Sequence, residues 1–209
     1  MRPLRLGVLI SGRGSNLLAI LEAIERGEVP ATVALVVCNR AEAPGLAHAT
    51  SRGIPTFLAT RTMHPVRADR HAAIADALVE AGAELLVLGG WSEIFVPEFV
   101  QHFEGRILNV HPSLLPAFGG TLHAQAEALA YGVKVSGCTV HLVTTDLDAG
   151  PIVVQRTVPV LDDDTVESLS ARILAEEHLA LPEAIRLFAE GRVSVDGRRV
   201  SVRSARDSV

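Results

Sequence analysis

At residues 106–116 the chain reads RILNVHPSLLP, an apolar run followed by an Asn-x-His pair and two prolines. The run that begins at Ile107 predicts a short buried strand. Asn109 and His111 are two positions apart, so their side chains share one face of an extended chain. Pro112 then ends the strand, because proline lacks a backbone N–H and restricts the residue before it.

This pattern predicts an amide and an imidazole together at the carboxyl end of a strand, which is where open α/β sheets bind their ligands. For Asn-x-His alone, the alternative is an ordinary strand end with a capping Asn and a surface His.

Apolar runs alternate with helical periodicity along the rest of the chain, which is typical of an α/β fold. Strands are predicted at residues 4–10, 32–37, 55–59 and 85–88, with further extended segments at 133–144 and 152–160. Helices are predicted at 17–24, 44–52, 67–81, 94–103, 121–131 and 166–190, and a β-hairpin at 193–202. We therefore expect an open, mostly parallel twisted sheet with helices on both faces, a long C-terminal helix and a β-hairpin.

Three local patterns refine this expectation. The helix at 67–81 is expected to bury Ala72, Ile74, Leu78 and Val79. The aspartates at 162–164, with Thr165, are expected to cap the long helix, which explains them without a metal ion. The hairpin is expected to turn at Asp196-Gly197.

Composition limits the kinds of partner. The 209 residues are 48% hydrophobic and 21% charged, with a net charge of −5, as expected for a globular domain. No basic run predicts binding to nucleic acid, and no apolar run is long enough to span a membrane. Cys38 and Cys138 lie in apolar runs and are predicted to be buried free thiols, with no metal site. The first strand begins at once, so we expect no signal peptide and a cytoplasmic location.

The turn at residues 11–16 (SGRGSN) lies between the first strand and a helix. This order favours an anion site, because the N–H groups at the start of the helix point outward and its dipole favours negative charge. Ser15 or Asn16 could cap the helix or donate to a ligand. The spacing is neither that of a dinucleotide fingerprint nor that of a P-loop, so a phosphate monoester is favoured. A Gly-rich turn without a ligand is the alternative.

A candidate catalytic set consists of Asn109, His111 and a carboxylate from the acidic loop at 144–151. A carboxylate beside His111 would favour the imidazolium, which can donate a proton near neutral pH. The amide of Asn109 can stabilise a developing oxyanion. No Ser or Cys nucleophile is paired with His111, so direct group transfer is favoured over a covalent intermediate. Asp146 and Asp148 both qualify as the carboxylate, and Asp148 also fits a purely structural role in its turn.

The run NVHPSLLP at 109–116 resembles the signature of the folate-dependent formyltransferases, and the resemblance extends from about Leu6 to about Gly191. It implies a Rossmann-like formyltransferase fold, with a single domain at 1–191 and a C-terminal hairpin and tail at 192–209. The resemblance selects Asp148, within DAGPI at 148–152, as the carboxylate that assists His111, and it places His141 near the site.

Binding residues also follow from the resemblance. It assigns Gly14, Ser15 and Asn16 to the phosphate of a ribonucleotide, and Glu177 to substrate contact. The folate positions that it implies are Arg67, Ser92, Glu93, Ile94, Phe95, Asn109, Thr144, Thr145, Asp146, Leu147 and Asp148.

The implied reaction transfers a formyl group from 10-formyltetrahydrofolate to the amine of glycinamide ribonucleotide, as the short purine-pathway members do, without a metal. The rivals are a formyltetrahydrofolate deformylase, which normally carries an extra N-terminal domain, and the methionyl-tRNA and sugar-nucleotide formyltransferases, which usually carry a C-terminal one. A catalytically idle folate- or nucleotide-binding module is a rival of another class, and a homodimer is left open.

The chain departs from the family pattern at two places. Ser92-Glu93 stands where the family usually has Met-Arg, which reverses a charge beside the folate site. We expect the side chain of Glu93 to point to solvent. The segment at 118–123 also differs, and we expect it to change only the local loop shape, without touching Asn109, His111 or Asp148.

Overall fold

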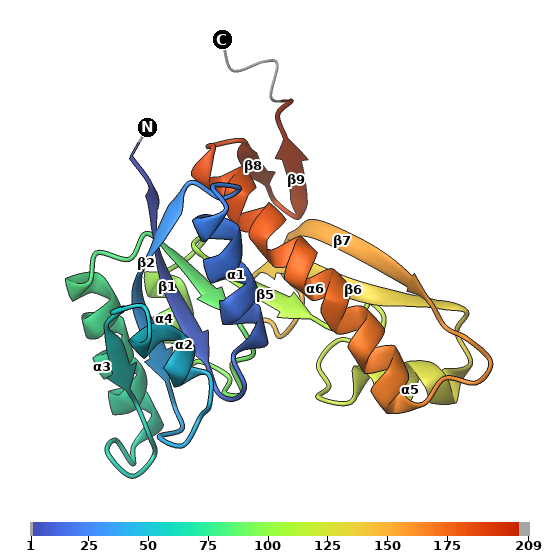
Figure 1. Ribbon diagram of the computed structural model, residues 1–209, viewed down its shortest axis with the longest axis horizontal. Helices are drawn as coiled ribbons and strands as arrows, with labels where there is room; N and C mark the ends of the chain where they lie inside the picture. The colour runs from blue at the N-terminus through green and yellow to red at the C-terminus, as the bar shows by residue number, and fades with distance from the viewer. Residues whose placement is uncertain (1, 205–209) are drawn as a thin grey trace. The chain divides into compact units, whose positions relative to one another are not determined.

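The computed structural model describes residues 2–204. The chain divides into two units, Met1–Asn109 and Val110–Val209. The first unit is built on five parallel strands in the order β3-β2-β1-β4-β5. Figure 1 labels β1, β2 and β5 of these. The strands are β1 (Leu4–Ile10), β2 (Ala31–Cys38), β3 (Thr56–Leu58), β4 (Leu85–Leu88) and β5 (Ile107–His111), whose last two residues belong to the second unit. β1, β2 and β4 are buried along most of their length, which explains their continuous apolar sequences.

Four helices connect these strands: α1 (Ser15–Glu25), α2 (Leu46–Thr50), α3 (Arg67–Glu80) and α4 (Pro97–His102). α4 is shorter than predicted, because Pro97 occupies the first helical position, where a missing N–H costs nothing.

The predicted buried face of α3 was partly wrong. Ile74 and Leu78 are buried, but Ala72 and Val79 are exposed, Val79 by 55%. Arg70 and His71 take their place on the buried face. Charged side chains were not expected there, because burying them requires partners that the local pattern does not show.

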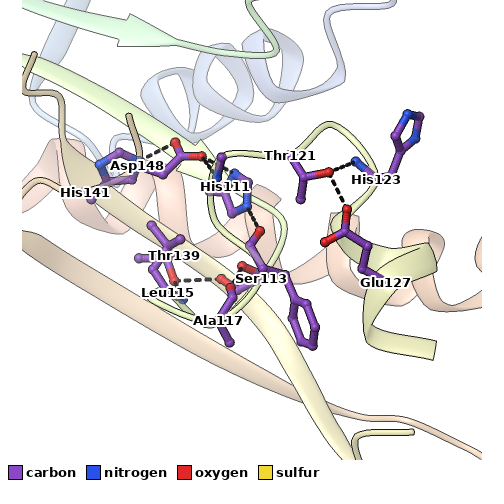
Figure 2. A network of polar contacts seen from close by, with 12 residues as sticks. His111, Ser113, Leu115, Ala117, Thr121, His123, Glu127, Thr139, His141 and Asp148 are labelled. Carbon is purple, nitrogen blue, oxygen red and sulfur yellow. Dashed lines mark hydrogen bonds and ion pairs between the residues drawn. The ribbon is translucent and has the colours of Figure 1, made fainter. Parts of the chain in front are cut away.

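The second unit pairs β6 (Val135–Leu142) antiparallel with β7 (Ile152–Pro159), and the long helix α6 (Val166–Ala189) packs on both strands. α5 (Ala124–Tyr131) ends at Gly132, a left-handed residue, as predicted. It begins three residues later than predicted, because Thr121 folds into a turn in which its hydroxyl donates to Glu127 and accepts from the N–H of His123 (Figure 2).

The start of α6 corrects the predicted role of the aspartates. The cap is Thr165, which exchanges hydrogen bonds with Ser168 in a capping box. Asp164 instead forms an ion pair with Arg172 at 2.8 Å and accepts from the N–H of Leu161. The hydrogen bonds from Arg172 and Ser168 hold the pKa of Asp164 well below its usual value.

The hairpin of β8 (Val193–Asp196) and β9 (Arg199–Val202) forms as predicted, and so does the mostly parallel α/β fold with its long C-terminal helix. Cys38 and Cys138 are buried and free, as predicted. Burial raises the pKa of the Cys138 thiol to about 12, so it stays protonated. Within residues 2–204, no three His, Cys, Asp or Glu side chains are arranged to hold a metal ion. No helix in the described range is both long and apolar enough to span a membrane.

Candidate active site

His111, the last residue of β5, is 5% exposed and lies between two hydrogen-bond acceptors. Its Nδ1 atom is 3.3 Å from Oδ2 of Asp148 (Figure 2), and its Nε2 atom is 2.8 Å from the carbonyl oxygen of Phe118. Neither a carboxylate nor a carbonyl can donate, so each ring nitrogen faces a group that can only accept a hydrogen bond from it.

Asp148 faces two histidines at once. Its side chain is 9% exposed, and His141 lies 3.6 Å from Oδ1, on the other side of the carboxylate from His111 (Figure 2). The backbone N–H of Gly120 donates to Oδ2 at 2.8 Å. Burial raises the pKa of Asp148. The hydrogen bonds from His141 and Gly120 and the positive charge of His111 together outweigh burial, so the pKa lies below its usual value. Asp148 is therefore an ionised carboxylate held between two imidazoles.

The choice between the two aspartates of the loop is visible in the geometry. Asp146 is exposed, and its backbone carbonyl accepts hydrogen bonds from the hydroxyl of Thr144 and the N–H of Ala149. Asp148 has φ of 50°, a left-handed backbone conformation that is uncommon outside glycine but better tolerated by Asp and Asn. Asp148, and not Asp146, is the carboxylate beside His111.

The loop after β5 is fastened to β6 by a buried threonine. Thr139 donates to the carbonyl of Ser113 at 2.7 Å and accepts from the N–H of Leu115 at 3.0 Å. Gln155 on β7 donates both to Thr139 and to the carbonyl of Leu115. The hydroxyl of Ser113 donates to the carbonyl of Ala117, next to Phe118. These bonds fix the backbone before Phe118, and so the position of the Phe118 carbonyl beside His111.

The expectation that the divergent segment at 118–123 would not touch the candidate catalytic residues was wrong. The Phe118 carbonyl contacts His111, and the N–H of Gly120 contacts Asp148. Phe118 and Gly120 have φ of 54° and 74°, which turns the loop back toward the two side chains. Both contacts are made by backbone atoms, which every residue has, so the residue types do not reveal them. The one hint in the sequence was the Gly119-Gly120 pair, which is typical of a tight turn.

The turn before α1 has the shape expected of an anion site. Gly14 lies just before the helix with φ of 71°, and no side chain caps the first turn. The prediction that Ser15 or Asn16 caps the helix was therefore wrong, since both are already helical. A Cβ at Gly14 would approach the backbone of Gly45 to 2.7 Å, so this position requires glycine on two counts. The helix start keeps N–H groups that no side chain cap engages.

Glu93 does not point to solvent, which corrects a second expectation. Its side chain is only 7% exposed and forms an ion pair with Arg70, which is 2% exposed. His71 lies 3.8 Å from the same carboxylate. Burial raises the pKa of Glu93, but the hydrogen bonds and charge of Arg70 outweigh it, so the pKa lies below its usual value.

The other residues assigned to binding are distributed over both units. In the first unit, Arg67 and Ser92 are exposed, Ile94 is 61% exposed, and Phe95 is buried and stacked on Phe99. Asn109 is the last residue of that unit and pairs with Leu88 of β4. In the second unit, Thr144, Thr145 and Leu147 are exposed, and Glu177 is 8% exposed on α6. The contacts described above bring together His111, His141 and Asp148.

The chain is similar to known proteins along most of its length. Residues 4–185 match the family model described as formyl transferase. The chain is 43% identical to the trifunctional purine biosynthetic protein adenosine-3 of Gallus gallus over 91% of its own length, but it spans only 19% of that protein. It is 44% identical to the phosphoribosylglycinamide formyltransferase of Mycobacterium tuberculosis, over 96% of this chain and 92% of that one.

Solved structures extend the comparison. The glycinamide ribonucleotide transformylase 1 of Symbiobacterium toebii has a TM-score of 0.94 and 50% identity, covering 97% of this chain and 95% of that one. A formyltetrahydrofolate deformylase from Pseudomonas syringae has a TM-score of 0.90 at 25% identity, covering 97% of this chain and 66% of that one. The chain belongs to the formyl transferase family.

Proposed function

We propose that this protein transfers the formyl group of 10-formyltetrahydrofolate to the amine of glycinamide ribonucleotide. The observation that carries the proposal is His111 held between the ionised carboxylate of Asp148 and the Phe118 carbonyl. The relatives that the chain covers almost completely, such as the Mycobacterium tuberculosis protein, are named for this activity.

The donor set fits the needs of formyl transfer. When bound, 10-formyltetrahydrofolate supplies an activated formyl group, whose carbon forms a bond to the amine nitrogen as its bond to the folate nitrogen breaks. Negative charge develops on the formyl oxygen, and a protonated imidazole donates a hydrogen bond to such an oxygen far better than a neutral group. His111 is that donor once its Nε2 atom turns from the Phe118 carbonyl to the formyl oxygen, while Nδ1 stays with Asp148. The amide of Asn109 is the second donor.

Asp148 has two tasks in this proposal. As an ionised, buried carboxylate it stabilises positive charge on the ring of His111. It also accepts the proton that the amine must lose, directly or through water, while the folate nitrogen gains one. His141, on the opposite side of the carboxylate, helps to hold Asp148 in place.

The remaining assignments concern substrate and folate binding. Gly14, Ser15 and Asn16 hold the phosphate of the ribonucleotide at the start of α1, where an anion is favoured by the helix dipole. Glu177 contacts the ribonucleotide, and the folate is bound by Arg67, by residues 92–95 and by the loop at 144–148. The buried free thiols Cys38 and Cys138 suit a reducing cytoplasm, where we place the protein. A monomer and a homodimer both fit this proposal.

One assay tests the function. The protein is mixed with 10-formyltetrahydrofolate, with and without glycinamide ribonucleotide, and tetrahydrofolate formation is followed. We expect turnover only when the ribonucleotide is present. Turnover without it would make the protein a hydrolase, and no turnover in either case would make it a binding module.

A further inference from the structure

We propose that the C-terminal hairpin positions the catalytic loop, and that Arg198, in its turn, is the positioning residue. The guanidinium of Arg198 donates a hydrogen bond to the carbonyl oxygen of Ala149, the residue that follows Asp148. The two residues are 49 positions apart in the sequence, so they meet only when the hairpin is folded against the loop. The inference rests on the proposed function in so far as Asp148 acts there.

The loop needs support from outside itself. Residues 144–147 are exposed, and Asp148 lies in a left-handed conformation with φ of 50°. Beyond it, Gly150 is pressed against β6, since a Cβ there would lie 1.8 Å from the carbonyl oxygen of Leu142. Asp148 and Ala149 thus lie between an exposed tip and a fixed end. The bond from Arg198 holds the peptide group between these two parts.

The hairpin is itself held at its open end. Arg192 donates from Nε to the carbonyl of Arg203 at 2.7 Å, and the N–H of Arg203 donates back to the carbonyl of Arg192 at 3.0 Å. β9 lies beside β7, whose first residues follow the catalytic loop (Figure 1). Most hairpin side chains are exposed, so the hairpin adds little to the core. Its turn nevertheless contacts the loop through the hydrogen bond from Arg198 to Ala149.

The direction of the Asp148 side chain depends on this backbone. Oδ2 of Asp148 must reach both His111, at 3.3 Å, and the N–H of Gly120, at 2.8 Å. Without Arg198, the Ala149 carbonyl turns to water and the loop gains conformations in which these contacts are longer. Because one hydrogen bond is lost, we expect turnover to fall by about three- to tenfold. KM for the ribonucleotide should change by less than about twofold, since no residue assigned to its phosphate lies on this loop.

The test compares Arg198→Ala, Arg198→Lys and a control, Arg199→Ala, in the full-length chain. Arg199 is the exposed neighbour in the same hairpin, and within residues 2–204 no side-chain hydrogen bond joins it to the loop. Turnover is measured together with the exchange rate of the Gly120 amide by NMR. We expect Arg198→Ala to lower kcat and to speed exchange at Gly120, Arg198→Lys to restore most of both, and Arg199→Ala to change neither.

The two readouts separate this inference from the proposed function. Arg198→Ala with unchanged kcat and unchanged Gly120 exchange would overturn the positioning role. An equal effect of Arg199→Ala would also overturn it, because the effect would then belong to the hairpin in general. If the unmodified protein lacked acceptor-dependent turnover, the proposed function would fail, while faster Gly120 exchange in Arg198→Ala would still support positioning.

Discussion

The Nδ1 atom of His111 lies 3.3 Å from the Oδ2 atom of Asp148, and less than a tenth of either side chain is exposed. An ion pair in this position is screened little by solvent, so the charge on Asp148 acts strongly on the ring. The pair joins the end of β5 to the loop that follows β6. The proposed proton transfer therefore depends on both segments.

Asp148→Asn removes this charge and keeps the shape of the side chain. Asn adopts left-handed backbone readily, so the loop should keep its conformation at φ of 50°. We expect kcat to fall by roughly 10²–10⁴-fold, the usual contribution of a positioned acid or base. Steady-state kinetics at saturating substrates, with circular dichroism as the folding control, measure this. A variant that retained more than about a tenth of the activity would exclude the role of the carboxylate.

Glu93→Gln should destabilise the protein, because Arg70 would remain buried without a charged partner. We expect a loss of about 3 kcal/mol, at the low end for breaking a buried pair, since Gln can still accept a hydrogen bond. The matched control is Glu25→Gln, which breaks an exposed ion pair with Arg52 and should cost much less, because solvent screens that pair. Urea unfolding measures both, and equal losses would contradict the burial of the Glu93 pair.

The difference between wild type and Glu93→Gln should also depend on pH. The pKa of Glu93 is lower in the folded protein than in the unfolded chain, so its contribution is fully present above the unfolded value of about 4.3. It is lost as the pH falls through the lower, folded pKa. Unfolding free energies measured from pH 7 to pH 3 should therefore converge for the two proteins at the acid end. If the stability difference between the two proteins grew on acidification, the pKa of Glu93 would be raised in the folded protein, not lowered.

Reversing the charge tests the pair in another way. Glu93→Arg would place two guanidinium groups together in a buried position and should cost more than Glu93→Gln. Adding Arg70→Glu restores opposite charges, so the double variant should be more stable than the sum of the two single changes predicts. Denaturant unfolding of all four proteins gives the coupling energy. A coupling near zero would mean that the two side chains do not interact.

Ser15→Ala tests the assigned phosphate position. A hydroxyl bonded to a charged phosphate contributes about 1.5–3 kcal/mol, so KM for the ribonucleotide should rise by roughly 10–100-fold while KM for the folate stays nearly constant. Ser51→Ala, an exposed serine in the same unit, is the control. A crystal soaked with the ribonucleotide provides the direct check, and a phosphate bound away from Gly14, Ser15 and Asn16 would refute the assignment.

Thr139→Val removes the hydroxyl that fastens the loop after β5 and keeps the volume of the side chain. The buried N–H of Leu115 and the carbonyl of Ser113 lose their partner, at a cost of about 1–3 kcal/mol for each group. We expect Tm to fall by several degrees, at about 2–4 °C per kcal/mol for a chain of this size. Thr157→Val, an exposed threonine on β7, is the control. Equal melting temperatures for the two variants would show that the threonine does not anchor the loop.

Local sequence patterns were enough to determine the strands of the first unit, the long helix α6 and the position of His111 at the end of β5. They succeed because apolar periodicity, glycine stops and proline breaks act within a few residues of one another. For the other helices the errors lie at boundaries, such as the late starts of α4 at Pro97 and of α5 at Ala124.

The tertiary structure decided which groups meet at the candidate site. The choice of Asp148 by geometry, the N–H of Gly120 that reaches it from 28 positions away, and the burial of Glu93 against Arg70 have no local pattern. Backbone donors and acceptors are the same in every residue, so no sequence marks the carbonyl of Phe118 as a partner of His111. A charged side chain is predicted to be exposed unless its partner is known. The partner of Glu93 is Arg70 on α3, and only the folded structure brings the two side chains together.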